Sequence, residues 1–280
     1  MQGEEIKVIS LSEKIISRVF ITTALIFTLL PLLSMLSASL EPADSTPLGL
    51  SIPKDPQWSN FKVALSGGHV LELMKSSSII VLFVVPITLI FATLASYAIG
   101  KMKIKGHTFI FTFFLLGLTI PFESLIVPLY YQVDRLGLLN SRMALVFPLI
   151  ALFMPFSIFW MRAHFLRMPA EINDAARVDG ATELQEFRYI HFPLALPSLS
   201  ALAVIIFIWT WNQFILGVVL IDDPLKRTVA GALTFFQGQY WISIPLISAS
   251  ALIIITPSLI LFLIFQRKFI SSLLQGAIKS

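Results

Sequence analysis

Cysteine is absent from this sequence, and charged residues are scarce. Because none of the 280 residues is a cysteine, disulfide frameworks and cysteine-based metal sites are excluded. Asp, Glu, Lys and Arg make up only 13% of the chain, about half of what soluble domains carry. Hydrophobic residues make up 56%, and the mean hydropathy is +0.86. This composition predicts a membrane protein that crosses the bilayer several times and is built of helices.

Motifs for nucleotide hydrolysis and for catalysis are also missing. The sequence contains no G-x-x-x-x-G-K-[ST] loop, no H-E-x-x-H pair and no nucleophile elbow. The four histidines do not have the spacing of metal ligands, so no metal site is predicted. A net charge of only +4, without a nucleic-acid-binding motif, gives no reason to expect a nucleic-acid partner. We therefore expect that this chain is not an enzyme and has no cofactor of its own.

Six apolar runs have roughly the 20 residues that a bilayer requires. We expect one transmembrane domain over residues 1–280, with spans at about 19–40, 76–100, 108–131, 143–161, 198–220 and 244–265. The first run is longer than the core of a signal peptide and follows acidic residues, which favours a retained anchor over a cleaved signal.

The positive charges predict the orientation. Three Lys or Arg residues precede the first span, three lie at 101–105, four lie at 162–188 and three lie in the tail, so 13 of the 20 are on one side. By the positive-inside rule this side is cytoplasmic. We therefore expect a multi-pass protein of a bacterial or archaeal cytoplasmic (inner) membrane, with both termini and the segment between spans four and five in the cytoplasm.

That segment, about 162–197, contains the longest polar run of the chain, Glu171 to Pro193. Pro169 suits the start of a short helix to about residue 178, and Gly180 suits a left-handed C-terminal cap. Thr182 and Gln185 form a capping box that predicts a second helix, which we expect Pro193 and Pro197 to stop. The small side chains of Ala175 and Ala176 would let another protein approach the first helix closely.

The spacing of this segment carries a family resemblance. Asp174-Ala175-Ala176, Gly180, Ile190, Phe192 and Pro193 resemble the coupling loop of permease subunits in binding-protein-dependent ABC importers. Asp174 stands where Glu is usual and Phe192 where Leu is usual, and both keep the chemical class. Further stretches are similar to the carbohydrate branch of this family; they are Trp58–Phe61, Ala95–Ala98, Ile126–Tyr130, Leu136–Asn140 and Pro155-Phe156. The tail, residues 266–279, is similar to the tail of maltose-type permease subunits.

The resemblance implies the partners and the coupling site. A second permease chain would complete the pathway, an extracytoplasmic binding protein would deliver a sugar-like solute, and two ABC ATPases would bind ATP and Mg. The ATPases would dock on a cytoplasmic coupling-helix elbow between helices 4 and 5. The residues implied there are Glu171, Asp174, Ala175, Ala176, Gly180, Ile190 and Pro193.

Polar residues within the spans are the candidates for a solute path. Glu123 lies in the third span, where an ionisable group is costly and often faces a cavity or a partner. The alternative interpretation is an interfacial, hydrogen-bonded Glu. The fifth span contains Trp209, Trp211, Asn212 and Gln213. Aromatic rings stack on sugar faces and amides bind hydroxyl groups, but Asn and Gln also hydrogen-bond between helices. Both interpretations stay open at this point.

An ion-coupled secondary transporter is the alternative function. It would need intramembrane acids, often within inverted repeats. Glu123 is the one acidic residue that qualifies, and no repeat is evident in the sequence.

Overall fold

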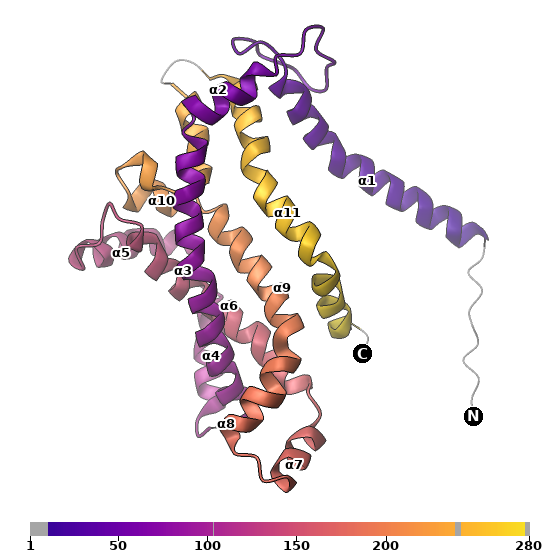
Figure 1. Cartoon of the computed structure of the whole chain (residues 1–280), viewed down its shortest axis with the longest axis vertical. Coiled ribbons are helices and arrows are strands. Elements are labelled where there is room, and N and C mark those ends of the chain that lie inside the picture. The colour runs from indigo at the N-terminus through magenta and orange to yellow at the C-terminus, as the bar shows by residue number, and fades with distance from the viewer. Residues whose placement is uncertain (1–10, 103, 239–241, 278–280) are drawn as a thin grey trace. The chain divides into compact units, whose positions relative to one another are not determined.

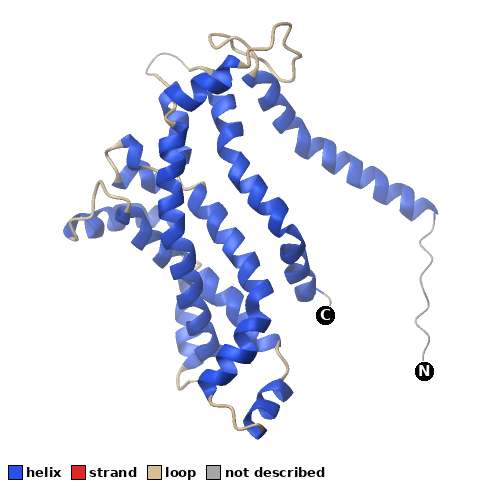
Figure 2. Ribbon diagram, in the orientation of Figure 1, coloured by secondary structure: helices blue, strands red, loops and turns tan. Residues whose placement is uncertain are grey.

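The computed structural model describes residues 11–102, 104–238 and 242–277. Their secondary structure is helical, apart from an isolated β-bridge between Gln237 and Ile242 (Figure 2). Five helices are long and apolar enough to cross a membrane, and the candidates become six if one bent helix pair is a single span. The predicted all-α, polytopic fold is confirmed. The cations Lys7, Lys103 and Lys279, which contributed to the predicted orientation, lie outside the described residues.

The chain divides into two compact units. The first comprises the described part of residues 1–68 together with 236–253. It contains α1 (Leu11–Ser39), α2 (Ser59–Gly67) and the beginning of α11 (Ile244–Ala277). The Asn60 amide donates to the carbonyls of Ser39 and Glu41 at 2.9 and 2.7 Å, which fixes the path of the chain between α1 and α2.

The second unit comprises residues 69–235 and the chain from 254 onward. Its centre is formed by α3 (Val70–Tyr97), α6 (Met143–Arg167) and α9 (Phe192–Trp211), which pack against one another (Figure 1). Large apolar side chains from all three helices are fully buried there, including Ile80, Leu149 and Leu202. Helices that are apolar on every side suit a bundle that meets lipid outside and packs on itself inside.

The predicted third span is not one straight helix. Residues 108–131 fall in α4 (His107–Gly117) and α5 (Phe122–Arg135), whose axes differ by 97°. Pro121 directly precedes α5 and has no backbone N–H, so it cannot continue the hydrogen-bond ladder of α4. The break makes this pair either a broken span or a re-entrant loop.

The prediction that Pro193 and Pro197 stop a helix is wrong. After α8 (Glu183–Glu186), the chain continues through one π-helical turn, η2 (Phe187–His191), directly into α9. Pro193 lies in the first turn of α9, where a backbone N–H has no partner within the helix, so its absence costs no intrahelical hydrogen bond. Pro197 lies inside α9, and membrane helices tolerate internal proline because neighbouring groups re-satisfy the backbone. The fifth candidate span is therefore 183–211, whereas the sequence suggested 198–220.

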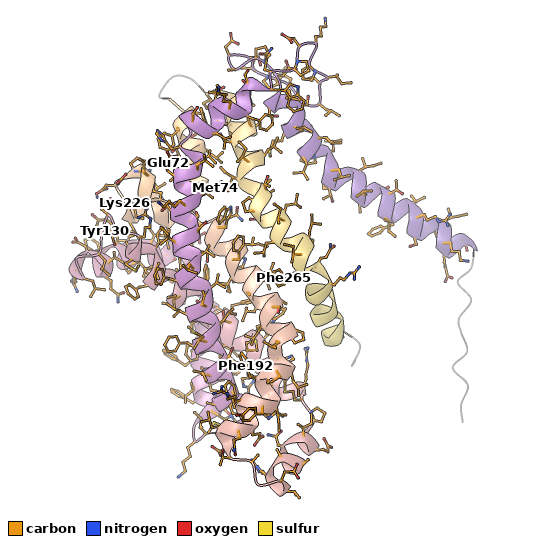
Figure 3. The ribbon with its side chains drawn as sticks, in the orientation of Figure 1. Glu72, Met74, Tyr130, Phe192, Lys226 and Phe265 are labelled. Carbon is orange, nitrogen blue, oxygen red and sulfur yellow. The ribbon has the colours of Figure 1, made fainter. Side chains whose placement is uncertain are left out.

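The other helices extend past the predicted span limits. α1 begins at Leu11, α3 continues as the π-helix η1 (Ala98–Met102), α6 reaches Arg167 and the backbone of α11 is helical to Ala277. Beyond α9 lie α10 (Ile215–Leu220) and the 3₁₀ helices η3 (Pro224–Lys226) and η4 (Val229–Phe236). In the view of Figure 3, Glu72 and Lys226 mark one end of the second unit and Phe192 lies towards the other.

Candidate functional site

The polar segment folds into the short helix that its sequence predicts. α7 (Ala170–Val178) begins directly after Pro169 and has Asp179 as its C-cap, followed by Gly180 with φ +77°. The N–H of Ala181 donates to the carbonyl of Ala176 at 2.9 Å, and the N–H of Gly180 donates to that of Arg177 at 3.1 Å. These two bonds form a Schellman motif, which satisfies carbonyls at the helix end. Space around the Gly180 α-carbon is open, so the preference for glycine comes from its backbone conformation alone.

One face of α7 is presented to solvent and the other packs inward. Glu171, Asp174 and Ala175 are exposed, as is Val178. Ala176 is only 5% exposed. The expectation that both alanines form an outer small-residue surface is therefore wrong for Ala176, because a helix turns about 100° per residue and places it on the inner face.

The second half of the segment begins with the predicted capping box. The N–H of Thr182 donates to Oε1 of Gln185 at 2.8 Å, and the N–H of Gln185 donates back to the Thr182 hydroxyl at 3.4 Å. Two orphan donors at the start of α8 are thereby satisfied. Ile190 is half-buried and Pro193 is exposed. In Figure 1, α7 and α8 lie together at the end of the second unit remote from α5 and α10.

A partly buried polar cluster lies behind α7, and the sequence interpretation did not single it out. Lys101, Asn173, Glu186 and His191 are joined by hydrogen bonds, and we call them the Asn173 cluster. His191 is fully buried, Glu186 is 2% exposed, and the ring of Tyr97 lies against His191 with centroids 5.2 Å apart. Glu186 and His191 are five residues apart, which in a regular α-helix separates them by about 140°. The π-helical turn that brings them together has no clear sequence signal.

At the opposite end of α9, a pocket of about 450 Å³ opens beside the break between α4 and α5. Its polar lining comes from Asn212 and Gln213, and its aromatic lining includes Trp209. Trp209 is 40% exposed, and its ring contacts the rings of Phe153 and Phe156, with centroid distances of 5.5 and 4.8 Å. The remaining walls are apolar or glycine; they are Gly117, Leu118, Ile120, Phe122, Leu125, Leu152, Phe153 and Ile208.

Two of the predicted path residues lie elsewhere. Trp211 is 3% exposed, stacks on Phe207 and donates its indole N–H to the carbonyl of Ile254 at 3.0 Å, so it packs on α11. Glu123 is exposed in the first turn of α5 and is not among the residues lining the pocket. Its role in a solute path stays a prediction. Among the described residues, no group of His, Asp or Glu is arranged to hold a metal ion.

The sequence matches a known family over most of its length. The profile of the family described as "Binding-protein-dependent transport system inner membrane component" matches residues 92–274. The matched region contains α4 to α10 and therefore both the α7 segment and the pocket.

Several relatives are carbohydrate permeases by name. The arabinooligosaccharides transport system permease protein AraQ of Halalkalibacterium halodurans is 33% identical over 256 residues, covering 89% of this chain and 90% of the relative. The trehalose transport system permease protein SugB of Mycobacterium tuberculosis is 31% identical over 255 residues, covering 90% and 93%.

A solved structure shares the fold. A chain of a bacterial ABC transporter involved in the import of the acidic polysaccharide alginate superposes with a TM-score of 0.77. The match covers 93% of this chain and 98% of that one, at 22% sequence identity.

Proposed function

Because this chain belongs to the family of binding-protein-dependent transport system inner membrane components, we propose that α7 is where ATP hydrolysis is coupled to solute movement. The observation that carries the proposal is the outward face of α7, where Glu171, Asp174 and Ala175 are exposed next to the Gly180 cap. A short, capped helix with one acidic, small-residue face suits docking into a groove of another protein.

The ATP itself would be bound by partner chains. The sequence has no phosphate-binding loop, so two ABC ATPases with their Mg would supply the hydrolysis and a second permease chain would complete the pathway. An extracytoplasmic binding protein would deliver the solute. The excess of Lys and Arg on one side of the predicted spans supports a cytoplasmic position for both termini and for α7 in the inner membrane.

The pocket at the end of α9 is our candidate for the solute path. Trp209 offers an aromatic face for the apolar side of a sugar ring, and Asn212 and Gln213 offer amides for its hydroxyls. None of the lining residues carries a charge, so the pocket has no cation to balance a phosphate or a carboxylate. We therefore propose an uncharged sugar or polyol as the solute, in line with the trehalose and arabinooligosaccharide names of two relatives.

Gly180 provides the test of the coupling proposal. A β-branched residue at φ +77° would carry strain of about 1–3 kcal/mol or leave that conformation, which would change how α7 is presented. Gly180→Val should therefore weaken ATPase copurification or uncouple hydrolysis from transport. Asn tolerates left-handed backbone, so Gly180→Asn is the matched control and should retain coupling. Asp174→Lys should also fail, because it reverses the charge at this position of the exposed face.

The measurement is copurification of the ATPases together with binding-protein-stimulated ATP hydrolysis in reconstituted vesicles. Normal docking and normal stimulation in both Gly180→Val and Asp174→Lys would show that α7 is not the coupling element.

A further inference from the structure

The Asn173 cluster connects α7 to the two helices that lead away from it. The side-chain amide of Asn173 is used at both ends: Oδ1 accepts from Nζ of Lys101 at 3.3 Å, and Nδ2 donates to Oε1 of Glu186. Lys101 belongs to η1, which continues α3, and Glu186 ends α8. One residue on the inner face of α7 therefore contacts the extensions of two long helices.

The contacts beyond Asn173 extend this connection. Nζ of Lys101 also donates to the carbonyl of Met168 at 2.9 Å, directly after α6. Nε2 of His191 lies 3.1 Å from Oε1 of Glu186, and because a carboxylate only accepts, this nitrogen must carry the hydrogen. His191 is the residue immediately before α9. Displacement of α7 would thus act on α3, α6 and α9 at their ends.

Stability alone is a poor explanation for this cluster. Apolar side chains of similar volume often stabilise a buried site as well as ionic groups do, whereas a satisfied polar network fixes one geometry. Both π-helices of the described residues, η1 and η2, contribute a member of the cluster. Single π-turns occur frequently at functional sites.

We propose that the Asn173 cluster is the positioning link that transmits movement of α7 to α9 and through it to the pocket. The proposal rests on the coupling role of α7. α9 is one continuous helix of 20 residues, about 30 Å long, that begins after His191 and carries Trp209 in its last turn. A continuous helix of this kind would transfer a displacement at Glu186 and His191 to Asn212 at its other end.

The experiment needs no knowledge of the solute. Asn212→Cys is introduced into this cysteine-free chain as a reporter, and the complete complex of both permease chains and cysteine-free ATPases is placed in nanodiscs. The rate of Asn212→Cys labelling by a maleimide is measured before and after trapping with Mg-ATP and vanadate. We expect a change of labelling rate in the otherwise unaltered chain. In Glu186→Leu and Asn173→Ala, the difference in labelling rate between the untrapped and trapped complexes should be smaller by at least about threefold. The ATPases should still copurify and hydrolyse ATP in both variants.

Two controls separate positioning from charge and from general damage. Glu186→Gln keeps the carbonyl acceptor and should retain the response. Glu183→Leu removes an exposed carboxylate from the same helix and should also retain it. Asn173 is only half-buried, so Asn173→Ala keeps the test valid if Glu186→Leu does not fold.

Three results would overturn the link. The first is an unchanged labelling response in Asn173→Ala, and the second is the absence of any labelling response in the otherwise unaltered chain. The third is loss of ATPase copurification together with the labelling response, because the cluster would then only support the docking surface. The two proposals can fail separately. If the cluster variants show a normal labelling response while Gly180→Val no longer binds the ATPases, the coupling role of α7 is supported and the role of the Asn173 cluster is refuted.

Discussion

Single side chains decide what the pocket at the end of α9 can bind. Asn212 and Gln213 are its two amides, and its other lining residues are apolar, aromatic or glycine. If a neutral sugar passes there, each amide contributes about 1 kcal/mol through a hydrogen bond to a hydroxyl, which corresponds to about fivefold in affinity. The polar contribution to recognition is therefore small enough to be removed one residue at a time.

We expect Asn212→Leu and Gln213→Leu each to reduce uptake about fivefold at low solute concentration, while the complex still assembles. The measurement is uptake of a panel of radiolabelled neutral disaccharides and polyols, with sugar phosphates for comparison. Gln132→Leu makes the same chemical change at an exposed site on α5 outside the pocket and should have no effect. Normal uptake in both pocket variants would leave only a packing role for these amides.

Ser76 holds together the other end of the second unit. Its hydroxyl donates to the carbonyl of Lys226 at 2.7 Å and accepts from Nε of Arg142 at 2.8 Å, and its side chain is fully buried. Removing the hydroxyl leaves Nε of Arg142 and the carbonyl of Lys226, which lie in half-buried residues, without this partner. Ser76→Ala should therefore cost about 1–3 kcal/mol of stability.

The measurement for Ser76→Ala is thermal unfolding of the purified complex. Ser78→Ala is the matched control, because Ser78 is exposed and bonds only to the carbonyl of Met74 in its own helix. Equal unfolding temperatures for the two variants would contradict the importance of the Ser76 contacts.

At the scale of helices, the contact of α4 with α6 depends on a missing side chain. A β-carbon on Gly117 would lie 3.0 Å from Cγ of Pro155, closer than ordinary van der Waals contact. Gly117 ends α4 just before the break, so the approach of the two helices also sets where the pocket opens.

We expect Gly117→Val to push α4 away from α6 and to cost about 1–3 kcal/mol, the usual penalty for overpacking. Thermal unfolding and maleimide labelling of a Leu118→Cys reporter would show the loss of stability and the altered pocket wall. Leu116→Val changes an exposed side chain one residue earlier and should leave both unchanged. If Gly117→Val has the unfolding temperature and the reporter labelling of the unaltered protein, Pro155 moves aside without loss of stability and the prediction is wrong.

At the scale of the whole chain, the predicted orientation can be tested with two nearly fully exposed side chains. Ile52 in the loop after α1 is 93% exposed and Val178 at the end of α7 is 88% exposed. In intact cells, an impermeant maleimide should label Ile52→Cys and should reach Val178→Cys only after the membrane is opened. If Val178→Cys is labelled in intact cells and Ile52→Cys is protected, the orientation is opposite to the predicted one and α7 does not face the cytoplasm.

Elements whose signals are local could be predicted from the amino-acid sequence. Apolar runs of bilayer length predicted the helices, since composition fixes whether a segment is stable in lipid. The Gly180 cap and the Thr182–Gln185 capping box were also predictable, because each involves residues only a few positions apart. The spacing around Asp174 and Gly180 was sufficient to indicate the family that the profile match then confirmed.

Contacts between residues far apart in the chain could not be predicted in this way. Proline suggested helix ends at 193 and 197, but a preceding π-turn and helix packing let α9 pass through them. Trp209 and Trp211 look equivalent in sequence, yet the helix turns one toward the pocket and the other onto α11. The Asn173 cluster joins Lys101 to Glu186 across 85 positions of the chain. Such long-range contacts depend on how the helices pack, and neither periodicity nor local spacing records that.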